Sequence, residues 1–196
     1  PQSVALGDLN GDGHLDIVTA NFLSDDVSIL LGNGDGTFTA QTRYTVGDGP
    51  YSIALGDLNG DGHLDIVTAN AQSNDVSILL GNGDGTFASQ ARYSVGNNPR
   101  LLALGDLNGD SRLDIVVANI NSDDVSILLG NGDGTFAAQT RYTVGDGPFS
   151  VALGDLDGDG DLDVVTANTN FNDVSILLGN GDGTFTAHTE YTVGNM

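Results

Sequence analysis

The sequence predicts an all-β fold built from β-propeller blades, with four four-stranded antiparallel blades per chain. The string DLNGDGHLD begins at Asp8 and returns in close variants at Asp57, Asp106 and Asp155, a step of 49 residues that divides all 196 residues into four copies. Each copy holds four short runs of strand-like composition separated by turn-forming residues, and none has a helical period of useful length. A four-stranded unit repeated every ~40 to 50 residues is typical of propeller blades.

The repeat divides the chain into four predicted units, residues 1–49, 50–98, 99–147 and 148–196, which together form one propeller or half-propeller domain, residues 1–196. Each unit begins with a proline. A β-roll made of short glycine-aspartate repeats is the competing repeat architecture, but its period is far shorter than 49 residues. Propeller blades therefore fit the repeat length better.

The expected strands follow one another in the same order in every copy. In the first copy, SVALG at residues 3–7 leads into an acidic loop over residues 8–16. The next two runs, LDIVTAN and DVSILLGN, are nearly continuous apolar segments, as expected of strands covered on both faces. The turn GNGDG contains Asn-Gly and Asp-Gly pairs, which tolerate the positive φ of a tight hairpin. The fourth run alternates apolar and polar residues from Phe38 to Val46, which predicts a half-exposed strand.

The acidic loop predicts a calcium site in each copy. Calcium takes six to eight oxygen ligands at roughly 2.3 to 2.6 Å, and a loop with side-chain oxygens at positions 1, 3 and 5 and a backbone carbonyl at position 7 wraps around one ion. Gly13 allows the sharp bend, and Asp16 at position 9 completes the expected ligand set. Magnesium requires a stricter octahedron, so this many closely spaced ligands suit calcium better. The candidate metal ligands of the four loops are Asp8, Asn10, Asp12, His14, Asp16, Asp57, Asn59, Asp61, His63, Asp65, Asp106, Asn108, Asp110, Arg112, Asp114, Asp155, Asp157, Asp159, Asp161 and Asp163.

Differences among the four loops refine this prediction. Position 7 is His, His, Arg or Asp, which fits a ligand that acts through its backbone carbonyl, so the histidines are not expected to bind metal through their rings. Ser111 replaces the bend glycine in the third loop and resists positive φ, which predicts the weakest site there. Asp157 and Asp161 add charge to the fourth loop, which predicts the tightest site.

EF-hand and dockerin loops begin with the same spacing of ligands. Those loops also need a carboxylate at position 12 and helical flanks. Position 12 here is Thr19, Thr68, Val117 or Thr166, and the flanking runs are strand-like. The helical interpretation is therefore excluded, and a solvated acidic turn remains the alternative to a calcium site.

The composition narrows the possible partners. The chain has no Cys, and 27 acidic residues against five Lys and Arg give a formal charge of −22. Such a field repels nucleic acid and anionic membrane surfaces, so neither is expected as a partner. Aspartate is typical of turns and liganding loops, and Glu190 is the one glutamate in the chain. Absent cysteine excludes disulfides and thiolate metal sites.

The segments ALGDLNGDGHLDIVTAN and LLGNGDGTF, with their counterparts in the other copies, resemble the FG-GAP or VCBS-type repeat of integrin α-subunit propellers, propeller lectins and many secreted bacterial proteins. The nine-residue D-x-[DN]-x-D-G-x-x-D loop corresponds to the calcium site of that family. The resemblance implies a β-propeller with calcium held between the first and second strands of each blade. It also implies an extracellular or cell-surface location, with any targeting segment outside this chain. Family members usually close with seven blades, and four copies depart from that number.

The copies differ mainly at one predicted end of the blades. Gln2, Tyr51, Arg100 and Phe149 follow the four prolines, and the connection between the second and third runs also varies. Aromatic and polar residues around one face predict a bound glycan or protein. Neutral drift in tolerant loops is the alternative explanation of this variation.

These observations predict a calcium-stabilised binding or adhesion module with lectin-like character. Because the copies are so alike, an engineered or amplified repeat scaffold, or a fragment without a ligand of its own, is the alternative. Enzymatic activity is not expected, since the candidate bases lie in repeated loops and turns and no nucleophile, base and orienting group occur together. His188 stands where the other copies have glutamine.

The open ends of a four-blade array predict self-association. One apolar face of the first sheet and one of the last would remain in water. A closed four-bladed ring needs about 90° between neighbours, whereas two chains head to tail form eight blades at about 45° and repeat the internal contacts. We therefore expect a homodimeric eight-bladed ring, with the closed four-bladed monomer as the alternative.

Overall fold

The computed structural model describes residues 1–194 and contains sixteen β-strands. They form four four-stranded sheets, one from each repeat, which confirms the predicted all-β fold and its four blades. Positions 195 and 196 of the predicted fourth unit lie outside the described residues. Within residues 1–194, no helix is long and apolar enough to cross a membrane.

The strands keep their chain order within every sheet. The first sheet contains β1 (Ser3–Gly7), β2 (Asp16–Asn21), β3 (Asp26–Leu30) and β4 (Thr42–Thr45). The second contains β5 (Pro50–Gly56), β6 (Asp65–Asn70), β7 (Asp75–Leu79) and β8 (Ala91–Ser94). The third contains β9 (Pro99–Gly105), β10 (Asp114–Asn119), β11 (Asp124–Leu128) and β12 (Thr140–Thr143). The fourth contains β13 (Pro148–Gly154), β14 (Asp163–Asn168), β15 (Asp173–Leu177) and β16 (Thr189–Thr192).

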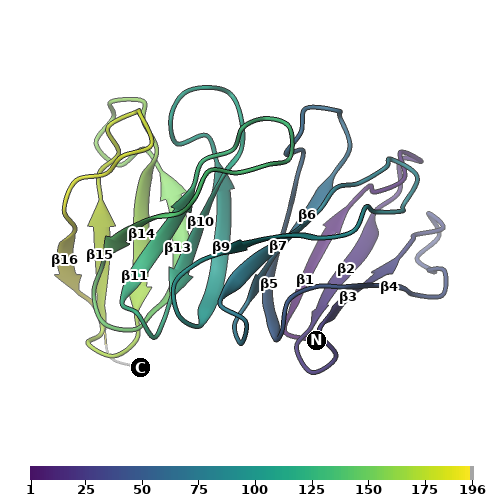
Figure 1. Cartoon of the computed structure of the whole chain (residues 1–196), viewed down its shortest axis with the longest axis horizontal. Helices are drawn as coiled ribbons and strands as arrows, with labels where there is room; N and C mark the ends of the chain where they lie inside the picture. The colour runs from purple at the N-terminus through teal and green to yellow at the C-terminus, as the bar shows by residue number, and fades with distance from the viewer. Residues whose placement is uncertain (195–196) are drawn as a thin grey trace.

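All neighbouring strands are antiparallel, so each sheet is an up-and-down blade. In the first blade the register runs from Ser3 opposite Ala20 to Gly7 opposite Asp16. The four blades stand side by side in chain order, from purple to yellow in Figure 1, and their first strands β1, β5, β9 and β13 are successive neighbours. The described chain is thus an arc of four blades with its two end blades on opposite sides of the molecule.

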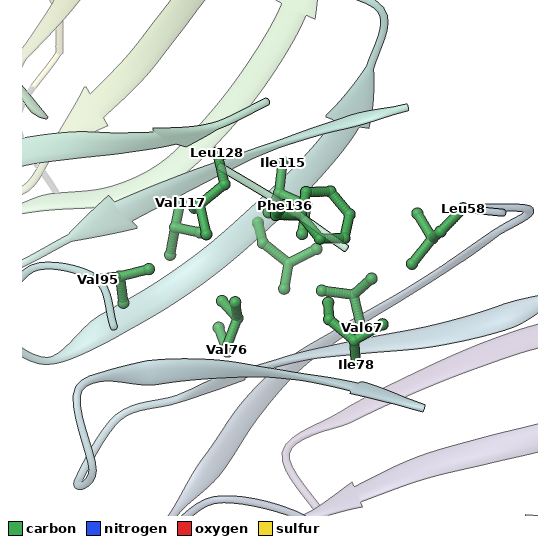
Figure 2. Packing of buried hydrophobic residues seen from close by; sticks show 11 residues of the cluster. Leu58, Val67, Val76, Ile78, Val95, Ile115, Val117, Leu128 and Phe136 are labelled. Carbon is green, nitrogen blue, oxygen red and sulfur yellow. The ribbon is translucent and has the colours of Figure 1, made fainter. Parts of the chain in front are cut away.

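The hydrophobic core lies between neighbouring blades. Three clusters of buried side chains fill the three junctions of the arc. Figure 2 shows the middle one, in which Val67 and Ile78 of the second blade face Ile115 and Leu128 of the third. Strands β6, β7, β10 and β11 are buried along their whole length, as the continuous apolar runs predict. Each fully buried Val, Leu or Ile contributes about 1.5 to 3 kcal/mol.

The fourth strand of each blade is shorter than the alternating pattern predicts. In the first blade β4 covers Thr42–Thr45, while Phe38 forms an isolated bridge with Gly32. Between these two points the chain leaves the ladder, and the side chain of Gln41 accepts a hydrogen bond from the Ser28 hydroxyl at 2.7 Å. The alternating residues therefore belong to two elements, the end of the hairpin and a separate short strand. This short strand is the outermost of the blade and lies largely in solvent.

Buried carboxylates at the start of the third strand pair with arginines of the fourth. Asp26 pairs with Arg43, and it also accepts a hydrogen bond from the Asn21 amide at 2.8 Å. The second and third blades repeat this ion pair with Arg92 and Arg141. The fourth blade carries Glu190 at this position. Three of the five arginines are thus engaged in holding the outer strand.

Both ends of the arc expose apolar surface. Val4 on the first blade is 63% exposed, whereas its counterpart Ile53 in the second blade is 9% exposed. Val193 on the last blade is 47% exposed, whereas its counterpart Val46 is 3% exposed. The two end blades therefore lack the neighbour that covers the same positions inside the arc.

Candidate metal centre

The acidic loop between the first two strands of each blade folds around its own side-chain oxygens. Asp8 accepts hydrogen bonds from the backbone N–H groups of Gly11 at 2.8 Å and Gly13 at 2.8 Å. Asp12 accepts from the His14 N–H at 2.8 Å. The bond from Gly13 is the largest cause that lowers the pKa of Asp8, so the loop favours its ionised form. The conformation therefore collects negative oxygens at one point of the blade.

The fourth loop brings three carboxylates together. Oxygens of Asp155, Asp157 and Asp159 lie within 4.8 Å of one another on the surface. In the first loop the side-chain amide of Asn10 donates to Asp12 at 3.0 Å, but Asp157 at the same position has no donor to offer. Desolvation, followed by the charges of neighbouring aspartates, raises the pKa of Asp157. An all-oxygen cluster with unbalanced charge is the donor set that Ca²⁺ prefers, so these residues fit the ion that the family implies.

The aspartate at position 9 has a structural role that the spacing alone does not reveal. Asp16 is fully buried, and its two oxygens accept hydrogen bonds from the N–H groups of Leu9 and Gly32, both at 2.8 Å. The same pair of bonds is present at Asp65, Asp114 and Asp163. Burial raises the pKa of Asp65 and of Asp114. This residue therefore joins the loop to the end of the third strand, and the second lone pair on each oxygen remains able to bind a metal.

The side chain at position 7 leaves the loop and lies against the hairpin that follows the third strand. A Cβ atom on Gly34 would come within 2.5 Å of the His14 ring. The same contact recurs between His63 and Gly83, and its counterparts in the last two blades involve Arg112 and Asp161. The hairpin glycine thus makes room for whichever side chain stands at position 7. This placement is consistent with the prediction that position 7 binds the metal through its backbone carbonyl and not through its side chain.

The third loop adopts the same bend with a residue that is strained in it. Ser111 has φ of 65°, compared with 85° for Gly13 and 84° for Gly62. Its N–H still donates to Asp106 at 2.7 Å. The left-handed region costs an L-residue roughly 1 to 2 kcal/mol. The third loop therefore forms its ligand geometry at a cost that the other three loops avoid.

We expect Ser111→Gly to tighten one of the four calcium sites. Releasing about 1 kcal/mol of strain corresponds to at most roughly fivefold in affinity, because strain that the loop also carries without calcium does not change binding. The measurement is a calorimetric calcium titration of both proteins. Gly62→Ser is the matched control, because a Cβ there meets nothing within 4 Å and the change tests backbone strain alone. It is expected to weaken one site by a similar factor, and unchanged affinities in both variants would contradict the strain argument.

The variable residues lie at the opposite end of the blades from the metal loops. The structure brings Tyr51, Arg100 and Phe149 together, with the guanidinium carbon of Arg100 4.4 Å from the Tyr51 ring centroid. Gln2 lies apart from this group, and its N–H donates to the Ala20 carbonyl. The predicted rim of aromatic and polar residues is thus one compact cluster, which the sequence could not locate because its members come from three different repeats.

A propeller arc with an acidic loop in each blade defines the class to which this protein belongs. Matches to the FG-GAP-like repeat cover residues 8–68, 57–117, 106–166 and 155–196. The chain therefore belongs to the FG-GAP-like repeat family, which confirms the resemblance seen in the sequence. No curated protein sequence matches the chain significantly.

Solved structures with similar folds are about twice as long as this chain. A lectin from Agrocybe aegerita that recognises non-reducing terminal N-acetylglucosamine is 27% identical, with a TM-score of 0.63 over 94% of this chain and 50% of the lectin. A putative 6-phosphogluconolactonase from Bacteroides uniformis is 15% identical, with a TM-score of 0.71 over 99% of this chain and 57% of that one. An auxiliary nutrient binding protein from Bacteroides ovatus is 12% identical, with a TM-score of 0.57 over 97% of this chain and 46% of that one. The latter two are similar in fold alone.

Proposed function

We propose that this protein is a calcium-stabilised β-propeller module that binds a glycan or a protein partner outside the cell, as in adhesion or glycan recognition. The observation that carries the proposal is the acidic loop, which is tied to the third strand through Asp16 and its counterparts and which in the fourth blade brings three carboxylates within 4.8 Å of one another. The similarity of this chain to a lectin that recognises a terminal sugar supports a glycan ligand. The cluster around Arg100 provides a surface for such a ligand at the end opposite the metal loops.

We expect one calcium ion per blade, at the weak affinities of extracellular modules, about 10⁻⁴ to 10⁻³ M. Such affinities require the calcium levels found outside cells, which is consistent with an extracellular location. Calorimetric titration with calcium is expected to show four ions per chain, and no heat of binding would contradict the metal sites. Glycan-array binding with and without calcium tests the ligand. Calcium binding without any glycan or protein ligand would favour the alternative, a repeat scaffold without a ligand of its own.

The proposal includes no catalysis. The one histidine outside the metal loops, His188, lies beside Glu190 with its Nε2 3.2 Å from a carboxylate oxygen. Glu190 is on the outer strand of the last blade and His188 directly precedes that strand, and within residues 1–194 no serine or threonine nucleophile is hydrogen-bonded to the pair. A binding role therefore accounts for the surface better than an enzymatic one.

We propose further that two copies of this chain close head to tail into an eight-bladed ring. The last blade presents the side chains that the first blade buries against the second. Leu156 is 52% exposed, whereas its counterpart Leu9 is 3% exposed. All six pairs of counterparts are identical in residue type: Leu9 and Leu156, Val18 and Val165, Ala20 and Ala167, Val27 and Val174, Ile29 and Ile176, and Val46 and Val193.

The first blade presents the complementary surface. At the junction of the first two blades, the second blade contributes four buried side chains, and the first blade carries nearly the same residues on its free face. These pairs are Ile53 and Val4, Ile66 and Ile17, Leu79 and Leu30, and Phe87 and Phe38. The two end faces therefore have the composition of one more internal junction, and a second copy supplies both halves of it.

The open space beside Gly154 has room for a leucine of the first blade. A Cβ on Gly7 would lie 2.6 Å from Leu64 of the next blade, and a Cβ on Gly56 would lie 2.7 Å from Leu113. At Gly154 nothing lies within 4 Å. Leu15, the counterpart of Leu64, is 61% exposed at the other end of the arc. In the proposed ring, Leu15 of one copy packs against Gly154 of the other, as Leu64 packs against Gly7 within the chain.

Polar and aromatic contacts at the junctions repeat in the same way. Tyr44 and Phe87 form an edge-to-face pair with ring centroids 5.5 Å apart, and the Phe87 N–H donates to the Tyr44 hydroxyl at 3.2 Å. Their counterparts at the free ends, Tyr191 and Phe38, are exposed. Because the end blades lie on opposite sides of the arc (Figure 1), a two-chain ring accounts for both faces better than a closed four-bladed monomer.

A further inference from the structure

Arg100 differs from the other arginines in having no carboxylate partner within residues 1–194. Three arginines pair with buried aspartates on the third strands, and Arg112 lies 3.8 Å from Asp110. Arg100 instead stacks on aromatic rings, 4.4 Å from the centroid of Tyr51 and 5.9 Å from that of Phe149. In a chain of formal charge −22, a guanidinium without an anion partner is unusual.

The stacking leaves hydrogen-bond donors of Arg100 unused. Its Nε atom is buried and has no acceptor in the described part of the chain. Tyr51 and Phe149 are themselves in edge-to-face contact, with centroids 5.9 Å apart, so the guanidinium plane is held by a rigid pair of rings. A planar guanidinium fixed in this way presents its remaining N–H groups in an orientation suited to a carboxylate.

The pocket beside Arg100 is free of carboxylates, unlike the equivalent region of the next junction. It has a volume of about 530 Å³ and is lined by Arg100, Phe22 and polar amides, among them Asn74, Asn97, Asn98 and Asn121. The other junctions carry Asp48 and Asp146 where this one has Asn97. At the next junction, the counterparts of Asn74 and Asn97 are Asp123 and Asp146. The acidic surface is thus interrupted at the one place where an unpaired arginine stands.

We infer that this pocket, which residues of the first three blades line, binds a sugar that carries a carboxylate. Arg100 receives the carboxylate, the asparagine amides offer donors and acceptors to hydroxyl groups, and Phe22 offers an apolar surface to the sugar ring. The surrounding charge favours a monoanion over a dianionic phosphate ester, because repulsion grows with ligand charge. This inference rests on the proposed function, and it names the chemical class of the ligand.

The test is binding of glucuronate and of its uncharged methyl ester to the calcium-loaded protein, measured by calorimetry or ligand-observed NMR. We expect glucuronate to bind and the ester to bind at least about tenfold more weakly, since it cannot form the charge-assisted pair. Equal binding of the two probes, or no binding of glucuronate, would overturn the inference.

Two variants assign the binding to this pocket. Arg100→Gln is expected to weaken glucuronate binding at least about tenfold, whereas Arg92→Gln, which removes an arginine of the outer strand, leaves it unchanged. Asn97→Asp restores the residue found at Asp48 and Asp146, so it is compatible with the fold, and it is expected to weaken glucuronate binding by placing a carboxylate beside Arg100. Unchanged binding in Asn97→Asp and Arg100→Gln would overturn the assignment.

The outcomes separate this inference from the proposed function. Binding of neutral glycans without binding of glucuronate would leave a lectin-like module and remove the carboxylate site. Glucuronate binding that depends on Arg100 in a protein that takes up no calcium would retain the site and remove calcium from the proposed function. Because uronates also bind calcium weakly in solution, the Arg100→Gln protein in the same buffer provides the baseline for both results.

Discussion

Gly154→Val is expected to convert a particle of twice the 20.1 kDa chain mass into a monomer. In the proposed ring, a side chain at this position enters the space that Leu15 of the second copy fills. Within one chain the change meets nothing within 4 Å and requires no positive φ, so the blade itself tolerates it. Light scattering coupled to size-exclusion chromatography in calcium buffer measures the outcome. A native particle near 20 kDa would contradict the two-chain ring, and a much larger particle would indicate an open polymer in its place.

The opposite face supplies an independent variant of the same test. Leu15→Asp places a charge on the first blade and is also expected to yield monomers, because every copy in a head-to-tail ring uses both of its end faces. A dimer formed through one face alone would be broken by one of the two changes and survive the other. Gly7→Val is the matched control inside the arc. It is expected to lower the melting temperature of the chain itself, since Leu64 and Leu55 already occupy that space.

Much of the fold follows from the repeat. Its period predicts the number of blades, and the apolar runs predict which strands are covered on both faces, as the burial of β6 and β10 confirms. These features depend on local pattern, and the pattern is present in every copy. The alternation between Phe38 and Val46 predicts a longer fourth strand than the structure has, because alternation does not show where backbone pairing stops.

The sites were predictable to the extent that their residues are close in sequence. Positions 1 and 5 of the acidic loop come together because only three residues of the chain separate them. The second role of Asp16 was missed, because one of its partners, Gly32, lies sixteen residues away on the hairpin. An aspartate directly before a continuous apolar strand is the signal that could have indicated it, since a carboxylate there must be buried and hydrogen-bonded.

The cluster at Arg100 could not be assembled from the sequence at all. Tyr51, Arg100 and Phe149 stand at the same place in three successive repeats, and their contact depends on the angle between blades. Repeat spacing gives no information about that angle. The substitution of Asn97 for aspartate is visible in the sequence, but its meaning depends on knowing that Arg100 is its neighbour in the pocket.

Removing calcium is expected to lower the melting temperature by roughly 20 to 40 °C. At calcium concentrations about a hundredfold above the dissociation constant, each site stabilises the folded chain by about 2.7 kcal/mol, and four sites by about 11 kcal/mol. For a chain of this size 1 kcal/mol corresponds to roughly 2 to 4 °C. Four ions also change the formal charge from −22 to −14, which reduces repulsion within the loops. Thermal unfolding in calcium and in chelator measures the difference.

Asp8→Asn is expected to remove about one quarter of this calcium-dependent shift. It replaces one ligand carboxylate and, because Gly11 and Gly13 donate to different oxygens of Asp8, the single amide oxygen keeps only one of these two bonds. The melting temperature in chelator therefore also falls, and the calcium-dependent shift is measured within each variant. Asp35→Asn is the matched control: it makes the same charge change in the neighbouring hairpin, where Asp35 binds Thr37 and belongs to no metal loop. It is expected to keep the full shift. An equal loss in both variants would show that calcium acts by general screening of negative charge and not by binding in the loops.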